Sequence, residues 1–245
     1  MRTELSRTRA EGLTLPIWWR DDDATEPTPA LDRLLNMTAD LNLPVHIAVI
    51  PKAATPALAE IAAATPLMVP VVHGWAHENL APAGQKRAEF GHPDAGAEAK
   101  TKAALARMRA LFGSDMLAMF VPPWNRVDAT VTSGLAAQGY VALSTFTPRR
   151  FKCSAGLVQI NTHIDPIAWR AGGGLLAPEE LIAKTVTLLQ DRREGRADCT
   201  EPLGFLSHHL VHDEAIWDFS RAFLTELLEG GANPSHFLGE PLDLP

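Results

Sequence analysis

Two histidines and a run of aspartates are the residues of this sequence whose types and spacing suit a metal ion. The stretch HGWAH places His73 and His77 four residues apart, and residues at this spacing share one face of a helical turn. Such a pair can bind one metal ion, although alone it is also compatible with two unrelated surface or core histidines. Three consecutive aspartates at 21–23 supply carboxylates. Two histidines and one aspartate would leave an open position for water, as in catalytic zinc sites.

Seven short apolar runs alternate with amphipathic stretches and would position these residues. The runs are residues 15–19, 44–50, 67–73, 116–121, 140–146, 157–163 and 203–210. Continuous apolar runs indicate strands buried on both faces, as in a parallel sheet, and the helical stretches between them indicate right-handed crossovers. The sequence therefore predicts an α/β fold, either an open doubly wound sheet or a barrel. No glycine-rich phosphate loop follows the first run, which argues against a dinucleotide-binding fold.

Polar and aromatic residues collect where these predicted strands end. In parallel α/β folds the reacting groups lie at the carboxyl ends of the strands. Aspartate, histidine or tryptophan follows five of the seven runs, in RDDD (20–23), HGWAH (73–77), PPWN (122–125), HIDPIAW (163–169) and SHHLVHD (207–213). Random surface polarity would not favour one edge of the sheet, so we expect a functional site there.

Composition argues against several other classes of function. The 245 residues carry a formal net charge of −7 without a basic cluster, which argues against a nucleic-acid partner. Two cysteines are too few for a disulfide scaffold or a thiolate zinc site. No apolar run reaches the roughly 18 residues of a membrane-spanning helix, and the N-terminus lacks the apolar segment of a secretory signal. We therefore expect a cytoplasmic protein of one domain, residues 1–245, with a core at about 15–230 and a C-terminal tail at 231–245.

Five short motifs, in order, resemble those of the polysaccharide deacetylase family, which is carbohydrate esterase family four. WRDDD is similar to T-F-D-D-G, HGWAH to H-[ST]-x-x-H, VPPWN to R-x-P-x-G, DPIAW to D-x-x-D-W, and LSH at 206–208 to L-x-H. The resemblance runs from residue 20 to 208. It implies a distorted (β/α)7 barrel and a divalent metal held by one aspartate and two histidines. Zinc is the metal that we expect, with cobalt or nickel as alternatives.

The resemblance also implies roles for the acidic residues. Asp21 would be the general base, and Asp22 would bind the metal together with His73 and His77. Asp23 then stands where the family has glycine, which leaves the register of this motif open by one residue. A metal at Asp22 would help Asp21 to stay ionised, because a cation lowers the pKa of a neighbouring carboxyl group.

Further roles follow from the third and fifth motifs. The backbone N–H of Trp124 would face the developing oxyanion, because the two prolines before it have no N–H. His208 would be the general acid that protonates the leaving amine, with His209 as the alternative one residue later. Leu206 would form an apolar wall for the acetyl methyl group.

Two motifs depart from the family pattern. Val121 replaces the arginine of the third motif, which orients the catalytic aspartate in the family, and Arg20 or Arg126 would have to substitute for it. The fourth motif keeps an aspartate and a tryptophan at changed spacing. Asp165 would orient the catalytic histidine or serve only as a turn residue, and Trp169 would line the pocket or only pack in the barrel.

The leading hypothesis is a metal-dependent hydrolase that removes an acetyl group from an N-acetylated sugar or glycan precursor. A cytoplasmic location would favour a small or lipid-linked sugar over a mature cell-wall polymer. A second hypothesis keeps the metal and changes the bond to another small C–N or ester linkage. A third is a non-catalytic barrel that binds a glycan or a partner protein, for which the lost third-motif arginine is the best argument.

Overall fold

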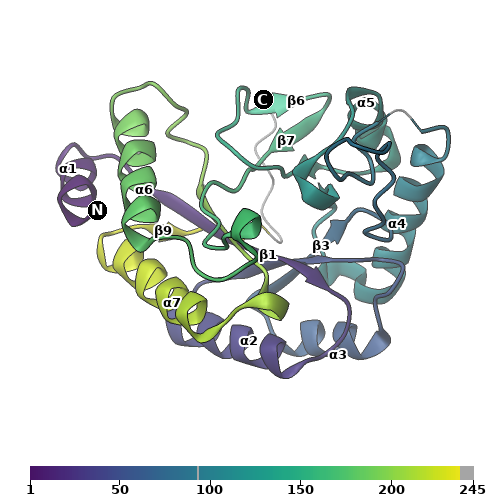
Figure 1. Ribbon diagram of the computed structural model, residues 1–245, viewed down its shortest axis with the longest axis horizontal. Coiled ribbons are helices and arrows are strands. Elements are labelled where there is room, and N and C mark those ends of the chain that lie inside the picture. The colour runs from purple at the N-terminus through teal and green to yellow at the C-terminus, as the bar shows by residue number, and fades with distance from the viewer. Residues whose placement is uncertain (93, 238–245) are drawn as a thin grey trace.

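Seven parallel strands form the central sheet of the computed structural model, which describes residues 1–92 and 94–237 (Figure 1). The strands are β1 (Pro16–Ala24), β2 (Val45–Val49), β3 (Met68–His73), β4 (Met119–Val121), β5 (Ala142–Leu143), β7 (Leu157–Gln159) and β8 (Leu203–Ser207). Their spatial order is β7-β5-β4-β3-β2-β1-β8. After β7, a parallel bridge from Ile164 to Phe205 links the chain to β8 and curls the sheet towards closure. The distorted (β/α)7 barrel that the resemblance implies is confirmed.

Helices connect most of these strands and cover the outside of the sheet (Figure 1). They are α2 (Pro29–Leu41), α3 (Pro56–Ala64), α4 (Ala97–Phe112), α5 (Ala129–Gln138), α6 (Pro178–Arg193) and α7 (Glu214–Glu229). Thr28, Asp128 and Asp213 begin α2, α5 and α7, and each side chain accepts a hydrogen bond from an N–H of the first turn. Such caps are local signals in the sequence for the start of a helix.

Two elements differ from the pattern expected from the sequence. The N-terminal α1 (Arg2–Ala10) has a weak apolar stripe, with Leu5 as its buried apolar residue, and Arg193 of α6 holds it by an ion pair of 2.6 Å to Glu4. Between β5 and β7 the described chain forms no helix, and the short strand β6 (Cys153–Ser154) pairs antiparallel with β7 instead.

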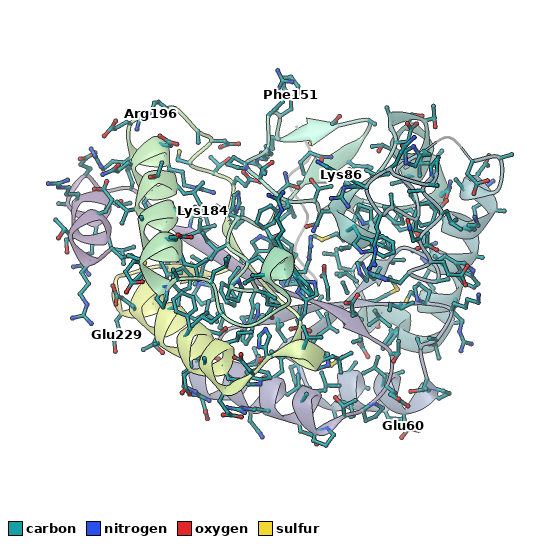
Figure 2. The ribbon with its side chains drawn as sticks, viewed as in Figure 1. Glu60, Lys86, Phe151, Lys184, Arg196 and Glu229 are labelled. Atoms are coloured by element: carbon teal, nitrogen blue, oxygen red, sulfur yellow. The ribbon has the colours of Figure 1, made fainter. Side chains whose placement is uncertain are left out.

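Two apolar clusters pack against the sheet, one inside the barrel and one between the sheet and the helices. Trp18, Ala48 and Val71 belong to the inner cluster, whereas Trp19 belongs to the larger cluster that the helices share. Because side chains alternate along a strand, Trp18, Arg20 and Asp22 of β1 face the interior, and Trp19 and Asp21 face the helices. Figure 2 shows that charged side chains of the helical layer, such as Glu60 and Glu229, point away from the sheet.

The C-terminal segment folds back on the start of β1. The short β9 (Asn233–Pro234) pairs with Pro16 and Ile17. Beyond it, the ring of Phe237 lies 5.9 Å from that of Trp18 and 5.1 Å from that of His46, so the described part of the expected tail packs at the amino end of the strands. Residues 238–245 of that tail lie outside the described residues. No helix in the described part of the chain is long and apolar enough to cross a membrane.

Candidate active site

A bulge at the end of β1 turns two consecutive aspartates towards the barrel mouth. The pairing of β1 with β2 shifts between Asp22 and Ala24, and Asp23 between them has a φ of 81°. In a regular strand, neighbouring side chains point to opposite faces. The extra residue of a bulge breaks this alternation, so Asp23 can join Asp22 on the inner face.

Asp23, His73 and His77 form the group of side chains that suits a metal ion. The Nε2 atoms of His73 and His77 lie 3.1 and 3.2 Å from the same oxygen, Oδ1 of Asp23. One ligand atom from each residue lies within 4.8 Å of the others, which is compact enough for a single divalent ion. His73 ends β3, and the residues that lead from it to His77 form a loop and not the helical turn that the spacing suggested.

The tautomer of His73 fits a cation at this position. Its Nδ1 lies 3.0 Å from the carbonyl oxygen of Val121, and because a carbonyl only accepts, Nδ1 must carry the proton in the neutral ring. Nε2 then presents a lone pair to the carboxylate oxygen of Asp23. Nε2 of His73 and Oδ1 of Asp23 are then two acceptors 3.1 Å apart, which repel each other unless a proton or a cation lies between them.

The charges around this group push its pKa values apart. Burial alone would raise the pKa of Asp23, but the hydrogen bond and charge of His73 bring it well below the usual value. Burial would lower the pKa of His73, and the charges of Asp22 and Asp23 raise it above the usual value. Burial and the charge of His73 lower the pKa of His77. The carboxylate is therefore ionised at neutral pH, as a metal ligand must be.

The aspartates hold positions one residue away from those expected. We expected Asp22 beside the two histidines and Asp21 as the base, whereas the structure places Asp23 beside the histidines. Asp22 instead meets the buried Arg20. Asp21 faces the helices, where its carboxylate accepts hydrogen bonds from the Ser207 hydroxyl at 2.5 Å and the His209 backbone N–H at 3.0 Å. The physical reason is the alternation along β1, which puts Asp21 on the outer face and only Asp22 and the bulged Asp23 at the mouth.

Arg20 holds the inward-facing Asp22 by both carboxylate oxygens. Its Nε lies 2.8 Å from Oδ1 and its Nη2 lies 2.9 Å from Oδ2. The other donors reach across the barrel, to the hydroxyl of Ser144 at 2.7 Å and the amide oxygen of Asn125 at 2.8 Å. The alternative, Arg126, donates to the carbonyl of Arg87 in an exposed position, so of the two candidates only Arg20 meets a site aspartate.

His208 faces the same mouth from the end of β8. Its Nε2 lies 4.0 Å from Oδ2 of Asp22, and its ring packs edge-on against Trp169 with the centroids 4.8 Å apart. Trp169 is half exposed and donates its indole N–H to Asp165 at 2.8 Å. Among the described residues Asp165 makes no hydrogen bond to His208, so the expected orienting contact is not seen, and burial raises the pKa of Asp165.

His209, the alternative to His208, lies on the other face of its segment. Its Nδ1 is 2.5 Å from Oδ1 of Asp21, and its side chain has no exposed area. Geometry therefore distinguishes the two neighbours: His208 is at the mouth, and His209 is part of the packing between barrel and helices. Leu206 is buried two residues before His208, which puts both on the inner face of the strand.

Trp124 covers the side of the site next to His77. The two rings lie 4.3 Å apart, and Trp124 and Asn125 both have left-handed backbone conformations, with φ of 57° and 56°. This strained turn, η2 (Pro123–Asn125), follows β4 and brings the Asn125 side chain to Arg20.

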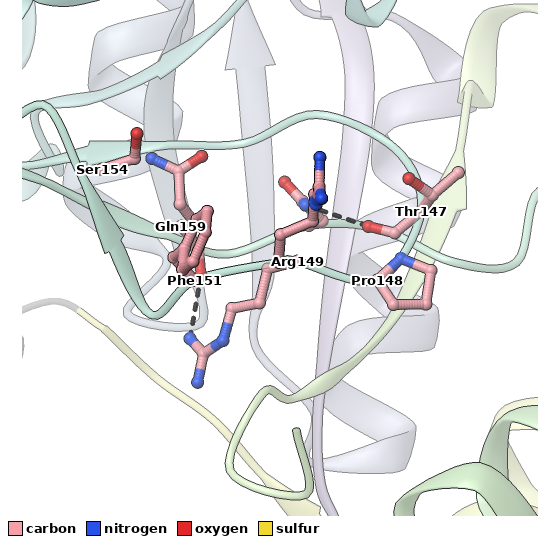
Figure 3. Close-up of a pocket in the computed structure, with 8 residues that line it drawn as sticks. Thr147, Pro148, Arg149, Phe151, Ser154 and Gln159 are labelled. Carbon is pink, nitrogen blue, oxygen red and sulfur yellow. Dashed lines mark hydrogen bonds between the residues drawn. The ribbon is translucent and has the colours of Figure 1, made fainter. Parts of the chain in front are cut away.

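A separate cavity of about 270 Å³ lies beside β7, lined by residues 147–151, Ser154, Gln159 and Asn161 (Figure 3). Its Arg149 donates to the carbonyl of Gln159 at 3.0 Å and to the carboxylate of Asp198 at 2.8 Å, so this guanidinium holds the loop in place. None of the aspartates and histidines described above lines this cavity.

Comparison with solved structures relates this arrangement to known proteins. A putative polysaccharide deacetylase from Mycobacterium smegmatis is similar with a TM-score of 0.65 and 15% identity, over 88% of this chain and 84% of that one. The family 4 carbohydrate esterase from Streptomyces lividans, solved with acetate, has a TM-score of 0.56 and 14% identity to this chain. The match covers 91% of this chain and 93% of that one. A third similar structure is a mutant of a CE4 family pseudoenzyme with restored enzymatic activity. Its TM-score is 0.55 and its identity 13%, over 90% of this chain and 65% of that one. No family model and no curated protein matches the sequence.

The chain has the fold of the polysaccharide deacetylases. At the end of β1, Asp22 and Asp23 are the consecutive pair that faces the barrel mouth, and Ala24 follows them. Arg20, which faces inward on β1, then contacts the first aspartate of the pair.

Sequence reasoning missed three polar residues that hold this site. Asn125 and Ser144 bind Arg20 from the segments that follow β4 and β5, far along the chain, and no local pattern marks them. The third, Glu89, accepts hydrogen bonds from the loop that carries His77, and it lies in a polar stretch without periodicity. Only the position of Asn125, directly after the third motif, was a signal that could have identified one of them.

Proposed function

We propose that this chain is a divergent polysaccharide deacetylase that hydrolyses the acetyl amide of an N-acetylated sugar or glycan precursor. One observation carries the proposal: a three-residue metal group, an arginine-bound aspartate and a histidine meet at one barrel mouth. The metal group consists of Asp23, His73 and His77. The arginine-bound aspartate is Asp22, and Nε2 of the histidine, His208, lies 4.0 Å from its Oδ2.

Asp23, His73 and His77 would hold a divalent ion, for which we propose zinc, with cobalt or nickel as alternatives. When bound, such an ion polarises a carbonyl oxygen and lowers the pKa of water to about 7. The donor set of two imidazoles and one carboxylate is the kind that leaves an open coordination position. Val121 keeps His73 in the correct tautomer through its carbonyl oxygen.

Asp22 is the residue that we propose as the general base in place of Asp21. It lies beside the metal group without belonging to it, and Arg20 fixes both of its oxygens. The bidentate ion pair holds the carboxylate in one orientation. Asp22 would therefore accept the proton of the attacking water.

His208 is proposed to give a proton to the leaving amine. It faces Asp22 across the mouth, and Trp169 restricts its ring on one side. Leu206 below it would contact the acetyl methyl group. Trp124 would wall the pocket next to His77, and its backbone N–H would face the oxyanion.

The proposal is tested by measuring acetate release. Purified protein with added zinc or cobalt is incubated with N-acetyl sugars, sugar nucleotides and chitooligosaccharides. We expect release from at least one substrate, at a rate that is at least about 100-fold lower for the Asp22→Asn variant. No acetate from any of them, with metal demonstrably bound, would contradict deacetylation of sugars.

Hydrolysis of a sugar O-acetyl ester is a second candidate. It is supported by the similar structure of a carbohydrate esterase that was solved with acetate. Acetylated xylooligosaccharides in the same assay distinguish the two bonds. A non-catalytic barrel is the third candidate, since one similar structure derives from a pseudoenzyme. The cytoplasmic location expected from the sequence stays a prediction.

A further inference from the structure

The loop between His73 and His77 is held by a carboxylate from a later part of the chain. Glu89 is 4% exposed, and its Oε2 accepts the backbone N–H groups of Trp75 at 3.1 Å and His77 at 3.2 Å. Its Oε1 accepts the N–H of Ala76 at 2.9 Å. Three consecutive N–H groups of the loop therefore converge on one buried side chain.

This loop needs such an acceptor because it is not helical. Gly74 and His77 have φ values of 57° and 56°, so the N–H groups between them point together and have no carbonyl of a preceding turn. Successive N–H groups in this arrangement form a concavity that binds an anion. Left unpaired, buried N–H groups would favour another loop conformation.

The fit between the loop and Glu89 is close. A side-chain carbon added at Gly74 would lie 2.5 Å from Oε2 of Glu89 and 2.5 Å from Cδ of Pro123. Glu89 and the turn after β4 therefore enclose the loop from two sides. Trp124 limits the rotation of the His77 side chain, because the centroids of the two rings lie 4.3 Å apart.

We propose that Glu89 is a positioning residue that sets the affinity of the Asp23–His73–His77 group for its metal ion by holding His77 in place. The proposal rests on the proposed function, because it assumes that this group binds metal. Glu89 itself would not be a ligand, since both of its oxygens are engaged by backbone N–H groups. Without it, the loop would have to be ordered when the ion binds, and affinity would fall.

Glu89→Gln is the most direct test, because the amide keeps the shape of the side chain and replaces one acceptor oxygen by a donor. The dissociation constants for Zn²⁺ and Co²⁺ are measured by competition with a chromophoric chelator. We expect weakening by about 10–100-fold, the range found when residues that support metal ligands are changed. The Co²⁺ absorption spectrum should also change, because His77 would no longer be held in one geometry.

Glu78→Gln is the matched control. Glu78 follows His77 directly and is exposed, and it pairs with Lys52 at 2.8 Å on the surface. The same charge is removed near the same loop, and we expect the metal affinity to stay within about threefold of wild type because exposed pairs are weak.

The outcomes separate the two proposals. If the wild-type protein binds no divalent ion, the metal site and the proposed function fail together with this inference. If the wild type binds and Glu89→Gln binds equally well, only the inference fails. Melting temperatures in chelator report whether the variant is folded. Should Glu89→Gln not fold, Glu89→Asp is used, whose carboxylate is one methylene short of the loop: weakened metal binding supports the inference, and unchanged binding overturns it.

Discussion

Arg20 and Asp22 lie two residues apart on β1, and the guanidinium of one binds both carboxylate oxygens of the other at 2.8 and 2.9 Å. Two residues apart on a strand means the same face, so both point into the barrel. Arg20 has no exposed area and Asp22 has 3%. Arg20, which is buried in the barrel interior, thus fixes the orientation of Asp22, the proposed base at the mouth.

The first prediction concerns Arg20→Lys. A lysine has no planar fork and cannot bind both oxygens of Asp22, so we expect kcat to fall by about 10–100-fold. Metal affinity should remain close to wild type, because Asp22 is not among the three proposed ligands. Steady-state kinetics and chelator competition measure the two effects. Arg126→Lys is the control and should be neutral, since Arg126 contacts a surface carbonyl. Full activity of Arg20→Lys would contradict the proposed role.

The second prediction separates Asp22 from Asp23. Asp23→Asn should abolish measurable metal binding, because the carboxylate is one of the three ligands. Asp22→Asn should bind metal and lose about 10²–10⁴-fold in kcat, the contribution of a general base. Metal content after dialysis and turnover are measured for both variants. The reverse result, with metal lost in Asp22→Asn alone, would restore the register that the sequence suggested.

The third prediction concerns stability and metal. A ligand at 100 times its dissociation constant stabilises the folded state by about 2.7 kcal/mol. For a chain of this size that corresponds to a rise in melting temperature of about 5–10 °C. Thermal denaturation with zinc and with chelator should show this difference in the wild type and not in Asp23→Asn. An equal rise in the variant would mean that zinc binds elsewhere.

The fourth prediction concerns the buried pair Asp21–His209. Burial would lower the pKa of His209, but the charge and hydrogen bond of Asp21 raise it above the usual value. A group with a raised folded-state pKa contributes full stability below its unfolded pKa of about 6.5, and this is lost as pH rises through the folded-state value.

Comparison with His209→Gln isolates that contribution. The difference in melting temperature between wild type and variant should be largest below the unfolded-state pKa of about 6.5 and shrink as the pH rises above it. Titrating groups that do not interact with His209 cancel in the difference. A difference that does not change with pH would show that folding leaves the pKa of His209 unshifted, and one that grows with pH would reverse the sign of its shift.

The strands and several helix starts were predictable because their signals are local. A buried strand shows as a continuous apolar run, and Thr28, Asp128 and Asp213 each cap the turn that directly follows them. The helix α1 was not predictable in this way. Its place on the barrel depends on Arg193, an ion-pair partner far along the chain.

The sequence by itself determined that His73, His77 and His208 lie where parallel strands end, because that follows from strand positions and their common direction. Three identical aspartates in a row cannot be distinguished by local pattern. The bulge at Asp23 depends on how β1 pairs with β2, and it decided that Asp23 joins Asp22 at the mouth. Likewise, only closure of the barrel brought Asn125 and Ser144 to Arg20, and only the fold of the 78–92 segment brought Glu89 under the loop of His77.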